Sequence, residues 1–95
     1  MQDDTFEWDD AKAERNRLHH RISFEMAREV FEDPFAVEWA DDGQHDAEDR
    51  FVAVGRVDGR LLFVSYTLRG SRIRIISARL AEPFERRRYH NEDQT

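Results

Sequence analysis

Cysteine is absent from this 95-residue chain, which excludes disulfide bonds, thiolate metal ligands and a cysteine nucleophile. No apolar run approaches the roughly 18 residues that a membrane-spanning helix needs, and the acidic N-terminus lacks the apolar stretch of a signal peptide. We therefore expect a cytoplasmic protein with no membrane partner. The length predicts one domain over residues 1–95, with residues 91–95 as a frayed tail.

Lysine is nearly absent too: Lys12 is the only one, and every other basic side chain apart from histidine is arginine. The net charge of −6 is unevenly spread, because residues 1–49 carry 16 acidic and 5 basic side chains, whereas residues 50–95 carry 5 and 10. Phosphate contacts depend on local clusters of this kind, and a guanidinium can bind two phosphate oxygens. The second half can therefore bind nucleic acid, with solvated surface arginine as the alternative. The acidic first half either attracts a basic partner or keeps the chain soluble.

Alternating apolar residues predict strands, helical spacing predicts helices, and glycine or proline marks the turns between them. The expected strands are 6–8, 35–39, 50–57, 60–68 and 72–79, and the expected helices begin after Asp9 or Asp10, after Ser23 and after Glu82. The order is β-α-α-β-β-β-β-α. Short turns join the last three strands, so the sequence predicts an α+β fold with an antiparallel sheet packed against the N-terminal helices.

Two elements carry expectations about which side chains are buried. In the first helix, Ala11, Leu18 and Ile22 mark the buried side. In the last strand, Ile73 and Ile75 share a face with Arg79 in a regular register, and that face is not cleanly apolar. Either one end of the strand faces water on each side, or a β-bulge intervenes.

Several short motifs stand in a fixed order along nearly the whole chain. They are Phe6-Glu7-Trp8-Asp9, Ala11-Lys12-Ala13 with Asn16, His20 before Ile22-Ser23-Phe24-Glu25, Val30-Phe31 with Asp33-Pro34, Glu48-Asp49-Arg50-Phe51, Ala53-Val54-Gly55, Asp58-Gly59, Tyr66-Thr67 with Arg69-Gly70, the run from Arg72 to Arg79, and Glu85-Arg86 with Tyr89. In this order and spacing they resemble the BrnT family, toxins of type II toxin–antitoxin modules. The chain departs from the family at His19-His20-Arg21, where the family has Lys-His-Gly, and at Glu82, where it has Thr or Ser.

The resemblance implies a RelE-like fold and a ribonuclease that inhibits translation. It also implies a BrnA-like ribbon-helix-helix antitoxin as partner, a hetero-oligomer formed with it, and contact with operator DNA through the antitoxin. RNA is then the substrate.

RNA can be cut without a metal when the ribose 2′-hydroxyl attacks the adjacent phosphate. The protein must stabilise the developing charge, which suits arginine. Arg79 is our first catalytic candidate, since a charge on a mostly buried face needs a partner or a cleft. A salt bridge to Glu7, Glu85 or Asp9 is the structural alternative. Arg69, at a strand end, is the second candidate.

Further candidates serve proton transfer and RNA binding. His20 can act as base or acid, or simply end its helix. Tyr66 is a catalytic candidate that can equally belong to the core. Arg72 and Arg74 are candidates for RNA binding, and Tyr89 for stacking on a base or for packing.

No cofactor or metal is expected, because the sequence has no glycine-rich phosphate loop and no ligand spacing. The acidic loop with Asp41, Asp42, His45, Asp46 and Glu48 is expected to be solvated. A nucleic-acid or protein binding module without catalysis is the alternative function, favoured by the departures at His19 and Arg21.

Overall fold

The computed structural model describes residues 1–43 and 48–91, and it confirms the α+β class. Its elements are, in chain order, strand β1 (Phe6–Glu7), helix α1 (Asp10–His20), helix α2 (Phe24–Ala27), a 3₁₀ helix (Arg28–Glu32), strands β2 (Val37–Asp41), β3 (Arg50–Val57), β4 (Arg60–Arg69) and β5 (Arg72–Leu80), and helix α3 (Pro83–His90). The second expected helix is therefore an α-helical turn followed by a 3₁₀ turn. His45 and Asp46 of the acidic loop, and residues 92–95 of the expected tail, lie outside the described residues.

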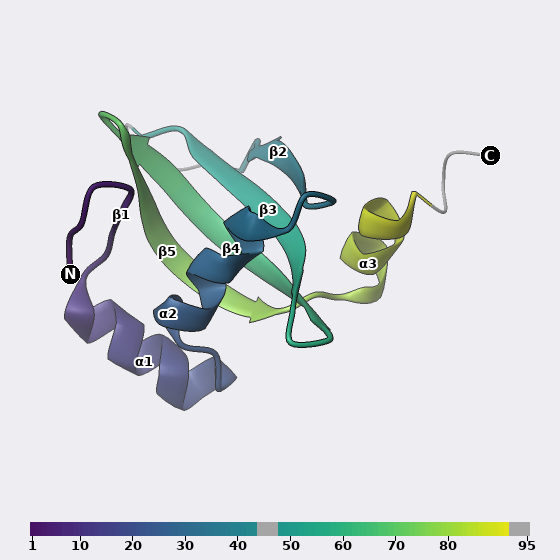
Figure 1. Ribbon diagram of the computed structural model, residues 1–95, viewed down its shortest axis with the longest axis horizontal. Coiled ribbons are helices and arrows are strands. Elements are labelled where there is room, and N and C mark those ends of the chain that lie inside the picture. The colour runs from purple at the N-terminus through teal and green to yellow at the C-terminus, as the bar shows by residue number, and fades with distance from the viewer. Residues whose placement is uncertain (44–47, 92–95) are drawn as a thin grey trace.

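The strands form one sheet in the order β1-β5-β4-β3-β2 (Figure 1). Strands β2 to β5 pair antiparallel, whereas β1 runs parallel to β5. The expectation of an antiparallel sheet is wrong in this respect. Tight turns with positive φ at Asp58, Gly59 and Gly70 set the direction of consecutive strands. No turn sets the direction of β1, because the chain passes through the helices and the rest of the sheet before β5 joins it.

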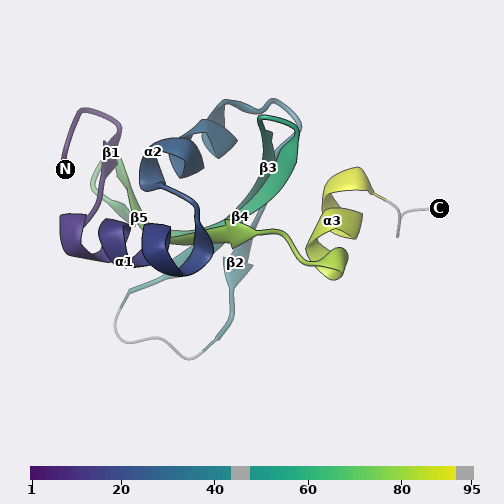
Figure 2. The same ribbon diagram turned by 90° about the horizontal axis from the view of Figure 1, so that it is seen from below.

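Helices α1 and α2 and the 3₁₀ helix cover one face of the sheet (Figures 1 and 2). The main core lies between them and includes Phe6, Trp8, Ile22, Phe24, Val30, Leu62, Val64 and Ile75. Gly55 lets the 3₁₀ helix approach β3, because a Cβ atom at that position would lie 2.9 Å from Val30 Cγ1. This contact explains a glycine in the middle of a strand.

Helix α1 lies against the edge of β5, and its buried side chain is polar. Asn16 donates from Nδ2 to the carbonyls of Ile22 and Ala78, both at 2.9 Å, and its Oδ1 accepts the Ala78 N–H at 3.1 Å. Strand β1 is too short to pair with this part of β5. The Asn16 amide supplies the hydrogen bonds that a neighbouring strand would otherwise make to Ala78. The expected burial of Ala11 and Leu18 is wrong, since both are exposed. The side of α1 that faces the sheet carries Asn16 instead, because the backbone groups at the edge of β5 need hydrogen-bond partners. Ile22 is fully buried as expected, beyond the helix end.

A β-bulge interrupts the pairing of β4 with β5. Ser65 pairs with Ser77 and Tyr66 pairs with Ile75, so Ile76 is an extra residue on β5. The β-bulge that was one of the two alternatives for this strand is confirmed. The expectation that Arg79 and Ile75 share a face of the sheet is wrong. The extra residue reverses the alternation and turns Arg79 to the side of its cross-strand partner Phe63, away from the helices.

The sheet face that is turned away from α1 and α2 is called here the second face. By strand alternation and register it carries six strand arginines: Arg50, Arg56, Arg69, Arg72, Arg74 and Arg79. Helix α3 stands beyond the C-terminal end of β5 in both ribbon views (Figures 1 and 2). It contacts the second face through Trp39, whose ring lies 6.4 Å from that of Phe84 and 4.1 Å from the Arg88 guanidinium.

Candidate nucleic-acid interface

Three of the arginines predicted from the sequence gather at the β4–β5 turn. Arg69 and Arg72 are cross-strand partners, and Arg74 follows on the same face. Arg69 pairs with Glu48 and remains nearly half exposed. Arg72 donates from Nε to the carbonyl of Asp3 at 2.7 Å. This end of the second face therefore presents several guanidinium groups, each held by a neighbouring carboxylate or carbonyl oxygen.

Arg74 is held more firmly than Arg69. Its Nη1 lies 2.6 Å from Glu7 Oε2, and the Glu7 side chain is only 14% exposed. The pair joins β1 to β5, because Glu7 is also the backbone register partner of Arg74. Arg74 is thus both a basic group of the second face and part of the contact that orders β1.

Arg50 belongs to the same end, and the sequence analysis did not single it out. Its place beside Thr67 follows from the pairing of Phe51 with Tyr66, and Thr67 in turn pairs with Arg74. The Arg50 Nε atom is buried and has no hydrogen-bond partner among residues 1–43 and 48–91. A buried donor without a partner is unusual in a folded protein.

Arg79 lies at the other end of the face and has a dedicated carboxylate. Its Nη1 and Nη2 donate to the two oxygens of Glu85, both at 2.8 Å, and the Glu85 side chain is 5% exposed. Glu85 holds the pKa of Arg79 above its usual range. The guanidinium also lies 4.1 Å from the centre of the Phe63 ring. Of the three salt-bridge partners considered for Arg79, the structure shows Glu85.

The Arg79–Glu85 pair leaves part of the guanidinium unused. Nη1 also donates to the Leu80 carbonyl at 3.1 Å, but Nε makes no hydrogen bond with a described residue. Glu85 accepts the N–H of Glu82 at 2.8 Å as well, which fixes it in the first turn of α3. Arg79 is therefore positioned by α3, and its Nε donor is not used by any described residue.

His20 is the last residue of α1, away from the arginines of the β4–β5 turn. It is half-buried, and its ring lies 4.4 Å from the ring of His19, edge to face. Arg21 then ends the helix with a left-handed φ of 62°. In both ribbon views this end of α1 lies beside the C-terminal end of β5 (Figures 1 and 2). His20 is thus near the strand that carries Arg79. The described side chains show no hydrogen bond or ion pair between the two residues.

Tyr66 faces the helices rather than the second face. It is 5% exposed, and its hydroxyl donates to Glu38 Oε2 at 2.9 Å. Its ring packs against Phe31 and Phe51. Burial, and secondly the hydrogen bond to Glu38, raise the pKa of Tyr66. The structure therefore separates Tyr66 from the arginines.

Tyr89 attaches α3 to the junction between the 3₁₀ helix and β2. Its hydroxyl donates to Asp33 Oδ2 at 2.7 Å, and the same oxygen accepts the Arg56 N–H at 2.8 Å. Burial alone would raise the pKa of Asp33, but the hydrogen bonds from Arg56, Tyr89 and Phe35 together lower it. Burial and Asp33 raise the pKa of Tyr89.

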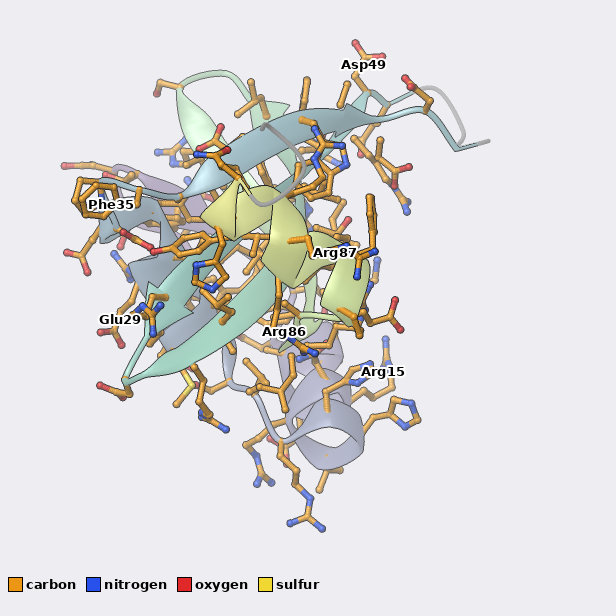
Figure 3. The ribbon with its side chains drawn as sticks, turned by 90° about the vertical axis from the view of Figure 1, so that its right-hand side faces the viewer. Arg15, Glu29, Phe35, Asp49, Arg86 and Arg87 are labelled. Atoms are coloured by element: carbon orange, nitrogen blue, oxygen red, sulfur yellow. The ribbon has the colours of Figure 1, made fainter. Side chains whose placement is uncertain are left out.

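Several charged residues of the helices can be located from the α3 end of the molecule. In Figure 3, viewed from the α3 end, Arg15 and Arg87 lie toward one side, and Glu29 and Phe35 lie toward the other. No sequence motif pointed to Trp39, whose ring lies against the Arg88 guanidinium. The only sequence feature that marked Trp39 was an aromatic residue in a short strand. That feature does not indicate which helix covers the ring. Basic groups interleaved with aromatic rings suit a polyanion with bases to stack.

Residues 1–43 and 48–91 contain no group of three or more His, Asp or Glu side chains placed to hold a metal ion. No helix within these ranges is long and apolar enough to cross a membrane.

The fold and the second face define a class: an α+β domain with an arginine-rich sheet face. The model of a family described as the ribonuclease toxin BrnT of type II toxin–antitoxin systems matches residues 8–85. The chain belongs to this family, so it is a toxin of the ribonuclease class with an antitoxin partner. A search of curated proteins found no match.

Proposed function

We propose that this toxin is an endoribonuclease that needs no metal and cleaves RNA bound across the second face of its sheet. The observation that carries the proposal is the gathering of six strand arginines on that face in a chain of net charge −6. The 2′-hydroxyl of the ribose attacks the neighbouring phosphate, and the 5′-oxygen of the next nucleotide leaves. Arginine stabilises the extra negative charge of the transition state without a proton of its own to lose.

Arg79 is the residue proposed to contact the reacting phosphate. Glu85 fixes the guanidinium through its two terminal nitrogens, so the Nε edge is oriented before RNA binds. Preorganised donors of this kind stabilise a transition state more than flexible ones, since they need no reorganisation during the reaction. Arg69, Arg72 and Arg74 hold flanking phosphates.

His20 is the proposed proton-transfer residue, as general base or general acid. Tyr89 is proposed to pack α3 in place, with its ring edge available to a base. Tyr66 is given a supporting role behind the sheet, because its hydroxyl is already bound to Glu38.

The toxin is further proposed to adopt a RelE-like fold and to inhibit translation in the cytoplasm. A BrnA-like ribbon-helix-helix antitoxin would neutralise it in a hetero-oligomer and connect it to operator DNA. Membership of the toxin family supports the existence of an antitoxin partner. That the antitoxin is of the BrnA-like ribbon-helix-helix type is our proposal.

The test is to incubate the purified chain with RNA in EDTA and to determine the ends of the products. Attack by the 2′-hydroxyl leaves a 5′-hydroxyl on one product and a cyclic phosphate on the other. Discrete products with these ends support the proposal, and cleavage that stops in EDTA contradicts its metal independence.

A binding module without catalysis is the second candidate function. The specific observation in its favour is the Arg79–Glu85 pair, because a buried carboxylate partner also suits a purely structural arginine. This candidate predicts intact RNA that is bound with a steep dependence on salt.

A further inference from the structure

A groove runs between helix α1 and the bulge of β5, outside the second face. It is lined by Lys12, Arg15, Asn16, His19, His20 and Ile76. The α1 residues recur at the spacing of one helical face, so a single side of the helix forms one wall. The bulged residue Ile76 forms the opposite wall, on the same strand as Arg79.

The charge of the groove has one sign, since no carboxylate lines it. The acidic residues of α1 are engaged elsewhere: Asp10 pairs with the N-terminal amine of Met1, and Glu14 with Arg17. The side chains of Lys12 and Arg15 make no salt bridge or hydrogen bond with any of the described residues. The pKa of Asp9, the residue that caps α1, is lowered first by the backbone N–H groups of Lys12 and Ala11, and both cations help to lower it further. Two unpaired cations on the helix side that faces a strand are not explained by the packing of α1.

The walls of the groove are also fixed in position. Asn16 binds Ala78 through two hydrogen bonds and Ile22 through a third, which ties α1 to β5 in the middle of the groove. A site on packed elements holds a ligand without the loss of freedom that ordering a loop requires. The groove is therefore a preformed place for an anion.

We propose that this groove binds the phosphodiester backbone of the RNA strand as it passes around the edge of β5 from the second face. Lys12 and Arg15 contact two phosphates, and the histidine rings line the end of the groove nearest the C-terminal end of β5. This inference rests on the proposed function, because it extends the same RNA track. A single strand suits the site, since its backbone can bend over the bulge where a duplex is stiff.

The experiment uses a short single-stranded RNA whose 2′-hydroxyls are methylated, so that it binds without being cut. Its affinity is measured against salt concentration for the wild type and for the double variant Lys12→Gln/Arg15→Gln. Loss of two phosphate contacts should weaken binding about tenfold at low salt and reduce the slope of log affinity against log salt by about 1.4. The matched control is Arg17→Gln/Arg60→Gln, which removes the same charge outside the groove and should change affinity less than about twofold.

Equal effects in the two double variants, or no binding of the oligonucleotide by the wild type, would overturn the groove as an RNA site. So would a variant that binds RNA normally but has lost affinity for the antitoxin, because the groove would then bind protein. Cleavage of ordinary RNA by the wild type is measured in parallel. If cleavage is present while the two variants bind alike, the groove proposal fails alone; if cleavage is absent while the groove variant binds weakly, the proposed catalysis fails alone.

Discussion

Arg79 was identified as a candidate from the sequence, but the residues that surround it were not all predicted. A charge in an apolar strand predicted a partner or a cleft, and the structure supplies Glu85 from a helix that follows it. The face on which Arg79 lies could not be assigned from the sequence, because the mixed faces of the strand allowed a β-bulge without locating the extra residue at Ile76. Arg50 was missed for a related reason: its significance lies in a buried Nε, which only the packed sheet reveals.

Substitution of Glu85 by glutamine tests the positioning of Arg79. The variant keeps a hydrogen-bond acceptor but loses the charge, so the free energy of unfolding should fall by about 1–2 kcal/mol. RNA cleavage should fall more than stability would explain, because the guanidinium is no longer fixed. Urea denaturation and cleavage rates check the two parts, and a variant with native stability and native rate would show that Glu85 positions nothing. Glu82→Gln, at an exposed carboxylate 3.8 Å from Arg79, is the matched control.

Arg21 offers a second test at the same scale. It ends α1 with a φ of 62°, where a side chain other than glycine is strained. Arg21→Gly should therefore raise the free energy of unfolding by about 1 kcal/mol, because glycine adopts this conformation without the steric penalty. A lower melting temperature would mean that the Arg21 side chain makes a contribution larger than the strain.

At the scale of elements, the structure separates what local chemistry determines from what distant contacts determine. Asp9 and Ser23 cap their helices as expected, and the turn residues of the β-hairpins lie where the sequence indicated. The parallel β1 strand and the polar contact of α1 were not foreseen, because each depends on a partner more than sixty residues away. Asn16 was noticed as part of a motif, and its reason is the open edge of β5.

Asn16→Leu tests whether α1 is held by hydrogen bonds or by packing. Leucine is similar in size but leaves the Ala78 N–H and two carbonyls unpaired in a buried place, so the free energy of unfolding should fall by about 2–3 kcal/mol. Leu18→Ala, on the exposed side of the same helix, should change it by less than about 0.5 kcal/mol. Thermal and urea unfolding measure both. An Asn16→Leu variant as stable as the wild type would contradict the claim that the Asn16 amide stabilises the edge of β5 through hydrogen bonds.

Asp33 links α3 to the rest of the fold in a pH-dependent way. Its folded-state pKa lies below the ordinary value of about 4. The carboxylate therefore contributes stability above about pH 4, and this contribution is lost as the pH falls through the lower folded-state value. Asp33→Asn should flatten this part of the stability curve, whereas Asp58→Asn in the exposed turn should leave it unchanged. Parallel curves for the wild type and Asp33→Asn would refute the link.

For the whole molecule, the division of charge along the chain becomes a division in space. Helix α2 and the 3₁₀ helix, with their acidic residues, lie over the sheet face opposite the second face, so their negative charge is kept apart from the six strand arginines. Composition alone argued against RNA, the charge of the two halves permitted it, and the order of motifs favoured it. The arrangement of the arginines required the sheet register.

The acidic side is a candidate surface for the antitoxin. Glu25, Glu29 and Glu32 are exposed and make no ion pair with a described residue. Replacing all three by lysine should weaken antitoxin binding about tenfold or more if a basic segment lies there. RNA cleavage by the free toxin should change little, since these residues are remote from the second face. Calorimetry with the purified antitoxin checks the first statement, and unchanged affinity would leave these residues with a solubility role.

The central claim is that arginine on the second face cleaves RNA, and Arg79→Lys tests it most directly. Lysine keeps the charge and can pair with Glu85, but it lacks the Nε edge proposed to contact the phosphate. The initial rate of RNA cleavage in EDTA should fall by about 100-fold or more, with the fold intact by circular dichroism, while Arg60→Lys on the exposed hairpin keeps the wild-type rate. A wild-type rate in a folded Arg79→Lys variant would contradict the account.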